Sequence, residues 1–242
     1  MGRSSLESPC RMTILMETTP YKACLFDLDG TLVDTLFSIA HFGNGALESF
    51  GLPAIAPAAY KRLVGNGADV LIQRMLETVG ARLRPEDVKA LRAEYDRRYE
   101  ADPLALAGPY PGLPDVLARL HERGVLLGVL SNKPDNMTQY IASAFYGKVL
   151  SQVRGQREGS PKKPDPAVPL EMAAAWGLSP GEILYIGDSG VDMETGKNAG
   201  MDACGVLWGF RDEEELRRCG AVYLAGDPAQ LLQAALGKGR KA

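Results

Sequence analysis

The fold of this chain is decided by residues 22–31, KACLFDLDGT. The first half of this stretch is a short apolar run, and the run ends at an acidic turn that contains glycine. An apolar run of this length, bounded by a turn, is typical of a strand buried on both faces of a parallel sheet. The stretch therefore predicts a buried strand with two carboxylates, Asp27 and Asp29, at its carboxyl end.

Similar apolar runs recur along the chain and alternate with segments of helical period. The runs occupy residues 125–130, 148–153, 183–186 and 203–207, with a weaker one at 221–224. The helical segments occupy residues 113–123, 135–146, 166–176, 192–199, 213–219 and 229–236. Strand alternating with helix predicts an α/β fold with a doubly wound parallel sheet and right-handed crossovers.

Residues 35–110, which we name the helical insert, interrupt this alternation. They contain helical patterns at 35–50, 68–79 and 85–100 and no convincing strand. In open α/β sheets ligands bind outside the carboxyl ends of the strands, and the insert begins just after the first strand. We therefore expect a small cap domain at 35–110 that covers a site on an α/β core formed by 20–34 and 111–242. A separate helical domain without a catalytic part is the alternative.

The length and charge of the chain exclude several classes of protein. With 242 residues it can form one large α/β domain or a core with a small insert. The net charge is −3, and the only basic block is a short tail at 238–241, so neither nucleic acid nor a membrane surface is an expected partner. The apolar runs are far shorter than the roughly 20 residues that span a bilayer.

The cysteines and the N-terminus indicate where the protein works. Its four cysteines, Cys10, Cys24, Cys204 and Cys219, form no C-x-x-C pair and are too few for a disulfide framework. A reducing cytoplasm is therefore the expected location. Residues 1–19 have an apolar patch too short for a signal peptide, so we interpret them as a flexible N-terminal extension.

The carboxylates of Asp27 and Asp29 can converge, because side chains two residues apart on an extended chain point to the same side. Two close carboxylates resist joint ionisation unless they share a proton or face a cation. Gly30 permits a tight turn after them. A surface turn made of residues that favour turns is the alternative for this pattern.

Two other strands also run into polar clusters. Residues 131–133, Ser-Asn-Lys, offer a hydroxyl, an amide and backbone N–H groups for an anion, although Ser131 could simply cap the next helix. Residues 187–192, GDSGVD, place Asp188 and Asp192 at another strand end, and carboxylates are the ligands that Mg²⁺ prefers. The alternative is that Asp188 caps a helix and Asp192 is solvated in its first turn.

A pair of lysines precedes Pro164 in a stiff segment between two strands. A lone pair of lysines is usually solvated. Held near an acidic cluster, however, one ammonium would offset the charge of a phosphate.

Together these four segments resemble the haloacid dehalogenase superfamily of phosphotransferases. The motifs are DLDGT at 27–31, Ser131 in VLSN, Lys163 in KPDP and GDSGVD at 187–192, and the resemblance covers roughly residues 20–237. The second aspartate marks a phosphatase-like member, and the insert after the first motif is similar to the small-cap subclass. Residues 64–72, VGNGADVLI, and the Lys-Pro-x-Pro form resemble the phosphoglycolate phosphatases.

The resemblance implies a mechanism. Asp27 attacks phosphorus to form an aspartyl-phosphate, and Asp29 serves as general acid and then general base. Mg²⁺ is held by Asp27, the backbone carbonyl of Asp29 and Asp188, with Asp192 in support. The residues expected to bind the phosphoryl group or order the loop around it are Thr31, Ser131, Asn132 and Lys163. The implied substrate is a small phosphorylated metabolite, with 2-phosphoglycolate preferred.

The helical insert should select the substrate. Asn66 lies between Gly65 and Gly67, which permit a close backbone approach to the site. An ordinary connection between helices explains these residues almost as well. The insert also carries cations that could meet a substrate carboxylate but usually face solvent, namely Lys61, Arg62, Arg74 and Lys89.

Several alternatives stay open at this point. Within the superfamily they are a phosphatase for another small phosphate, a pyrophosphatase or a sugar-phosphate mutase, and a non-catalytic binding protein could keep the same fold. Gly187-Asp-Ser-Gly190 is also similar to the nucleophile segment of a serine protease, but the pattern is α/β and only His41 and His121 could act as base. The sequence does not distinguish a monomer from a homodimer.

Overall fold

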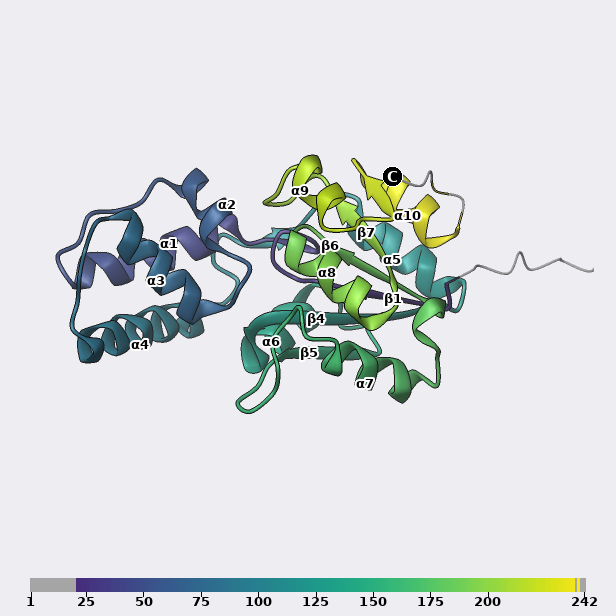
Figure 1. Cartoon of the computed structure of the whole chain (residues 1–242), viewed down its shortest axis with the longest axis horizontal. Coiled ribbons are helices and arrows are strands. Elements are labelled where there is room, and N and C mark those ends of the chain that lie inside the picture. Colours follow the sequence, from purple (N-terminus) through teal and green to yellow (C-terminus); the bar gives the residue numbers. More distant parts are fainter. Residues whose placement is uncertain (1–20, 238, 240–242) are drawn as a thin grey trace, which may run out of the picture.

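A parallel six-stranded sheet, with the strand order β5-β4-β1-β6-β7-β8, lies within the larger part of the molecule (Figure 1). This computed structural model describes residues 21–237 and Gly239, so the extension at 1–19, Cys10 and most of the basic tail lie outside the described residues. The strands are β1 (Ala23–Phe26), β4 (Leu126–Pro134), β5 (Gln152–Gln156), β6 (Ile183–Gly187), β7 (Asp202–Val206) and β8 (Tyr223–Ala225). The predicted doubly wound α/β fold is confirmed.

Helices cover both faces of the sheet, which is why β1 is an unbroken apolar run. Cys24 and Phe26 pack into one apolar cluster, whereas Ala23 and Leu25 pack into another, and all four are fully buried. The first cluster includes side chains of α5 (Leu113–Glu122), α6 (Asp135–Tyr146) and α10 (Pro228–Ala235). The second includes side chains of α7 (Ala167–Trp176) and α8 (Gly190–Ala199), and α9 (Glu213–Arg218) packs against α8. A short 3-10 turn, η2 (Pro180–Glu182), precedes β6.

Most strands begin and end within two residues of their predicted bounds, but β4 and β5 differ more. Strand β4 continues past Leu130 through the polar residues to Pro134, and α6 begins directly after it at Asp135. The fifth strand lies at 152–156 instead of 148–153, because Val149 and Leu150 pack against the core from the preceding loop. It is an edge strand of half-buried residues, QVRGQ, so its composition carries no apolar signal.

The helical insert contains α1 (Leu36–Ser49), η1 (Pro57–Ala59), α2 (Tyr60–Leu63), α3 (Ala68–Thr78) and α4 (Pro85–Ala101), which lie together to one side of the sheet (Figure 1). The expectation of no strand within 35–110 is wrong in one detail. Strand β3 (Gly108–Pro109) pairs antiparallel with β2 (Val33–Asp34), and a ladder of two residues is too short to show in a sequence pattern. Among the described residues, no helix is both long and apolar enough to cross a bilayer.

Strand β1 lies where the order of the sheet reverses. The chain visits β4 and β5 on one side of β1 and then β6, β7 and β8 on the other. Such a switch point leaves a crevice at the carboxyl ends of the central strands, where α/β proteins bind ligands. The helical insert leaves the core just after this end of β1.

Candidate active site

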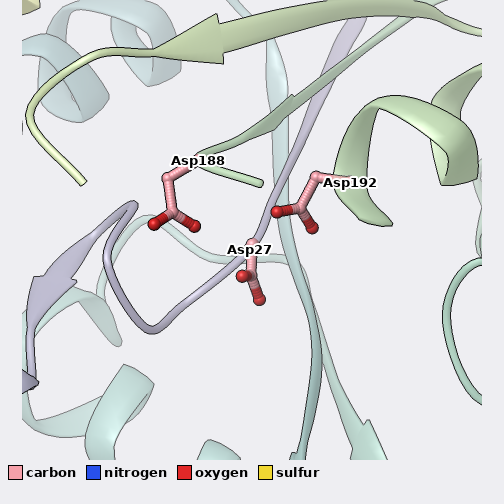
Figure 2. Close-up of side chains that lie close together, drawn as sticks. All are labelled: Asp27, Asp188 and Asp192. Carbon is pink, nitrogen blue, oxygen red and sulfur yellow. The ribbon is translucent and has the colours of Figure 1, made fainter. Parts of the chain in front are cut away.

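Three carboxylates meet at the carboxyl edge of the sheet (Figure 2). Asp27 follows β1, Asp188 follows β6, and Asp192 lies in the first turn of α8. One oxygen from each side chain lies within 4.8 Å of the other two, and all three residues are buried. The sequence placed these residues at strand ends, and the fold brings them together.

Lys163 lies against this cluster. Its Nζ is 2.8 Å from Oδ1 of Asp27 and 2.7 Å from Oδ1 of Asp192, and the side chain is almost fully buried. The side-chain amide of Asn132 accepts a hydrogen bond from the backbone N–H of Lys163 at 2.9 Å and donates one to its carbonyl at 3.3 Å. Asn132 therefore holds the backbone of Lys163 in place.

The cluster resists ionisation of all three of its carboxyl groups at once. Burial raises the pKa of Asp27 to about 7, an effect that Lys163 opposes and Asp192 reinforces. Burial likewise raises the pKa of Asp188 well above its usual value, and Asp192 and Asp27 reinforce this shift. Although burial disfavours the ammonium, Asp192 and Asp27 raise the pKa of Lys163 well above its usual value, so it stays charged.

With all three carboxyls ionised, the single ammonium of Lys163 would leave a deficit of positive charge, which a bound cation would supply. The available donors are carboxylate oxygens, which suit a hard divalent ion such as Mg²⁺. The residues present therefore fit a divalent metal site.

The alternative roles for Asp188 and Asp192 are both wrong. Ser189 is the N-cap residue of α8, and Asp192 is fully buried, with Oδ2 accepting from the backbone N–H and the hydroxyl of Ser189 at 3.1 and 2.6 Å. Asp188 instead accepts the N–H of Phe210 at 2.7 Å and the hydroxyl of Thr31 at 3.4 Å. Gly30 has a φ of +81°, and a side chain there would collide with the Asp188 carboxylate.

Asp29 does not share in the three-carboxylate cluster. Its two oxygens each lie 3.1 Å from Nζ of Lys133, which also lies 2.9 Å from the hydroxyl of Tyr99 in α4. In the sequence, Lys133 belongs to the polar run at 131–133, and no role was predicted for it. The only signal for such a role is its position directly after Ser131 and Asn132, the two residues expected to bind an anion.

The remaining predicted residues differ in how close their side chains come to the site. Ser131 is buried inside β4, so it cannot cap α6, and its hydroxyl accepts the N–H of Lys133 at 3.3 Å. The amide oxygen of Asn66 accepts from Arg74 at 2.9 Å. Gly65 and Gly67, not Asn66, line the adjoining cavity. The structure therefore does not bring the Asn66 side chain into the site.

A cavity lies between this edge of the sheet and the helical insert. Core residues on its wall include Asp27, Asp29, Ser131, Asn132, Lys133, Lys163 and Asp188. The insert contributes mainly apolar and tyrosine side chains, namely Ile39, Val64, Leu71, Tyr95 and Tyr99, with Asp96 and Glu100. Within the described part of the chain, none of Lys61, Arg62, Arg74 and Lys89 lines it.

Arg211 is a second residue of the site that no sequence pattern indicates. It lines the cavity from the loop after β7 and donates to the carbonyl oxygens of Lys61 and Val64, the latter at 2.8 Å. Arg211 thus ties the core to the helical insert.

The serine-protease alternative fails on the fold and on geometry. The sheet is parallel, and the two histidines lie on α1 and α5. Neither His41 nor His121 is among the residues that line this cavity in the described chain.

Comparisons with known proteins show which family this chain resembles. A model of haloacid dehalogenase-like hydrolases matches residues 24–206. A phosphoglycolate phosphatase of Vibrio cholerae is 33% identical over 89% of this chain and 97% of its own length, and an N-acetylmuramic acid 6-phosphate phosphatase of Pseudomonas aeruginosa is 29% identical over 90% and 96%. The crystal structure of a predicted phosphoglycolate phosphatase from Haemophilus somnus has a TM-score of 0.84 and 29% identity, covering 89% of this chain and 98% of that one.

Proposed function

Because the chain belongs to the haloacid dehalogenase-like hydrolase family, we propose that it is a Mg²⁺-dependent phosphatase that hydrolyses a small organic phosphomonoester through an aspartyl-phosphate. One observation carries the proposal. Carboxylates from separate segments meet beside a buried lysine at the sheet edge where α/β proteins bind ligands, namely Asp27, Asp188 and Asp192 beside Lys163.

Asp27 is the proposed nucleophile. Its carboxylate attacks phosphorus as the bond to the leaving oxygen breaks, and Lys163 at 2.8 Å offsets the charge that gathers there. Asp29 gives its proton to the leaving oxygen. It then takes a proton from the water that attacks phosphorus, and the bond between phosphorus and Asp27 breaks. The Asp27 carboxylate and the Asp29 carboxylic acid are regenerated, and inorganic phosphate leaves.

The metal would be held by Asp27, Asp188 and the backbone carbonyl of Asp29. When bound, Mg²⁺ would neutralise charge on the phosphoryl oxygens. Asp192 supports this arrangement through Lys163, with which it pairs at 2.7 Å. Thr31, Ser131, Asn132 and Lys163 are the proposed phosphoryl-binding and loop-ordering residues.

The helical insert is the proposed cap, on a core of residues 20–34 and 111–242. Arg211 and Asn132 bond backbone carbonyls of the segment 61–65 and so hold the insert against the site. A cavity closed in this way would exclude water and admit a small phosphate more readily than a protein surface.

The proposed substrate is 2-phosphoglycolate, which the names of several relatives support. The Pseudomonas relative makes N-acetylmuramic acid 6-phosphate the second candidate. A pyrophosphatase or mutase reaction would use the same core residues. Free thiols at Cys24, Cys204 and Cys219 support a reducing cytoplasm as the location.

The test is phosphate release from a panel containing 2-phosphoglycolate, N-acetylmuramic acid 6-phosphate, other small phosphomonoesters and pyrophosphate, with and without Mg²⁺. Asp27→Asn should abolish release while leaving a folded protein. Asp115→Asn, an exposed aspartate on α5, is the matched control and should keep wild-type rates. Near-normal turnover by Asp27→Asn would overturn the mechanism, and activity on another ester alone would replace the substrate.

A further inference from the structure

Lys133 is a buried lysine with no role in the proposed reaction. It lies in β4, and its side chain is only 6% exposed beside that of Asp29 at 12%. An ammonium has three N–H donors. Three oxygens lie within hydrogen-bond distance of its Nζ, both carboxylate oxygens of Asp29 at 3.1 Å and the hydroxyl of Tyr99 at 2.9 Å.

The two buried lysines of the site therefore contact different carboxylates. Lys163 contacts Asp27, the proposed nucleophile, whereas Lys133 contacts Asp29, the proposed acid and base. Because the partners of Lys133 already match its donors, it has none left over for a phosphate or a substrate carboxylate. A role in positioning Asp29 fits these contacts better than a role in binding substrate.

Tyr99 belongs to the helical insert and is itself held firmly. Its ring stacks on Phe42 of α1, with centroids 4.7 Å apart, and meets the ring of Tyr95 edge-on at 5.8 Å. The Nζ of Lys133 also lies 4.3 Å from the centroid of the Tyr99 ring. The position of Lys133 thus depends on an aromatic cluster built from two helices of the insert.

We propose that Lys133 is a positioning residue that fixes the Asp29 carboxyl for proton transfer, and that Tyr99 couples this arrangement to the placement of the helical insert. The inference rests on the proposed phosphatase function. Asp29 would then protonate the leaving group efficiently only when the insert lies on the core as in this structure, with Tyr99 in contact with Lys133. Hydrolysis of an ester whose leaving group needs no proton would be largely independent of both residues.

The test compares kcat/KM for three phosphates, because kcat/KM reports the steps up to departure of the leaving group. Propyl phosphate and 2-phosphoglycolate release alkoxides that need a proton, whereas 4-nitrophenyl phosphate releases a stable phenolate. Lys133→Met should lower kcat/KM about 100-fold for both alkyl esters, the lower range of a general-acid contribution, and at most about 3-fold for the aryl ester. Lys133→Arg should recover part of the loss.

Tyr99→Phe tests the coupling without disturbing packing, since only the hydroxyl is removed. It should lower kcat/KM for the alkyl esters about 5-fold, and the double variant with Lys133→Met should be no worse than Lys133→Met alone, because Tyr99 acts through Lys133. Lys22→Met and Tyr140→Phe are the matched controls, because the side chains of Lys22 and Tyr140 are exposed. Both should keep the wild-type kcat/KM for all three esters. Thermal unfolding checks that each variant is folded.

Three outcomes would overturn the inference while the phosphatase function stands. They are equal losses on alkyl and aryl esters, unchanged activity of Lys133→Met, and a loss confined to 2-phosphoglycolate, which would make Lys133 a ligand of the substrate carboxylate. A wild type without activity on any alkyl phosphate would overturn the proposed function first and this inference with it.

Discussion

The Nζ of Lys163 lies 2.7 Å from Oδ1 of Asp192, a carboxylate that is fully buried and whose other oxygen accepts from Ser189. Both oxygens of Asp192 are therefore engaged by the protein itself. Its place in the site is to hold Lys163 beside Asp27 and to brace the start of α8.

Asp192→Asn should destabilise the protein and slow catalysis together. The change leaves Lys163 with one carboxylate partner in a buried setting, and breaking a buried ion pair costs about 3–5 kcal/mol. Urea unfolding should show a lower free energy of unfolding by about that amount. A variant as stable as the wild type would show that Asp192 is not a structural partner of Lys163.

The pH dependence of stability should reveal the raised pKa of Asp27. A carboxyl whose pKa rises from its ordinary value to about 7 on folding contributes stability that is complete at low pH and is lost as pH rises through 7. Without metal, wild-type stability should fall between about pH 4 and 7 relative to Asp27→Asn, by at most about 1.4 kcal/mol per pH unit. Unfolding curves in chelator measure this difference, and parallel pH profiles would contradict it.

Removal of the metal should cost stability because the cluster loses its compensating cation. Ligand binding at 100 times the dissociation constant stabilises a protein by about 2.7 kcal/mol. Addition of Mg²⁺ to chelator-treated protein should therefore raise the melting temperature by several degrees in the wild type and in the Asp115→Asn control. The shift should vanish in Asp188→Asn, and its persistence there would place the metal elsewhere.

Loss of Arg211 should loosen the segment that it holds. Arg211→Met removes the donors to the carbonyl oxygens of Lys61 and Val64, so backbone amides of residues 60–68 should exchange hydrogen faster. Arg217→Met, which removes only an exposed pair with Glu213, should leave this exchange unchanged. We also expect Arg211→Met to raise KM several-fold. Identical hydrogen exchange in Arg211→Met and Arg217→Met would show that Arg211 does not hold this segment.

Much of the fold was predictable because its signals are local. The apolar run of β1 reports burial on both faces, and the polar residues that follow the apolar parts of β1, β4 and β6 mark the carboxyl ends of these strands. Parallel strands bring those ends to one edge, so Asp27, Ser131 and Asp188 can be grouped from the sequence alone. The bounds of strand β5 were predicted wrongly, because an edge strand can consist of polar residues and then gives no apolar pattern.

The contacts of the insert could not be predicted, because they depend on how separate segments pack. Lys133 meets Tyr99 and Asp29, which are 34 and 104 residues away in the sequence. No local pattern distinguishes such a lysine from a solvated one. The position of the Asn66 side chain was equally hidden, because its amide oxygen accepts a hydrogen bond from Arg74 in the second turn of α3.

The two-residue ribbon of β2 and β3 has an evolutionary consequence. Val33 pairs with Pro109 and Asp34 with Gly108, so the chain departs for the insert and returns from it at neighbouring positions. Because its two ends adjoin, the helical insert can be shortened, enlarged or exchanged without changing the order of the strands in the sheet. If the insert selects the substrate, as proposed, selection can change substrate preference through the insert alone while the acidic cluster stays as it is.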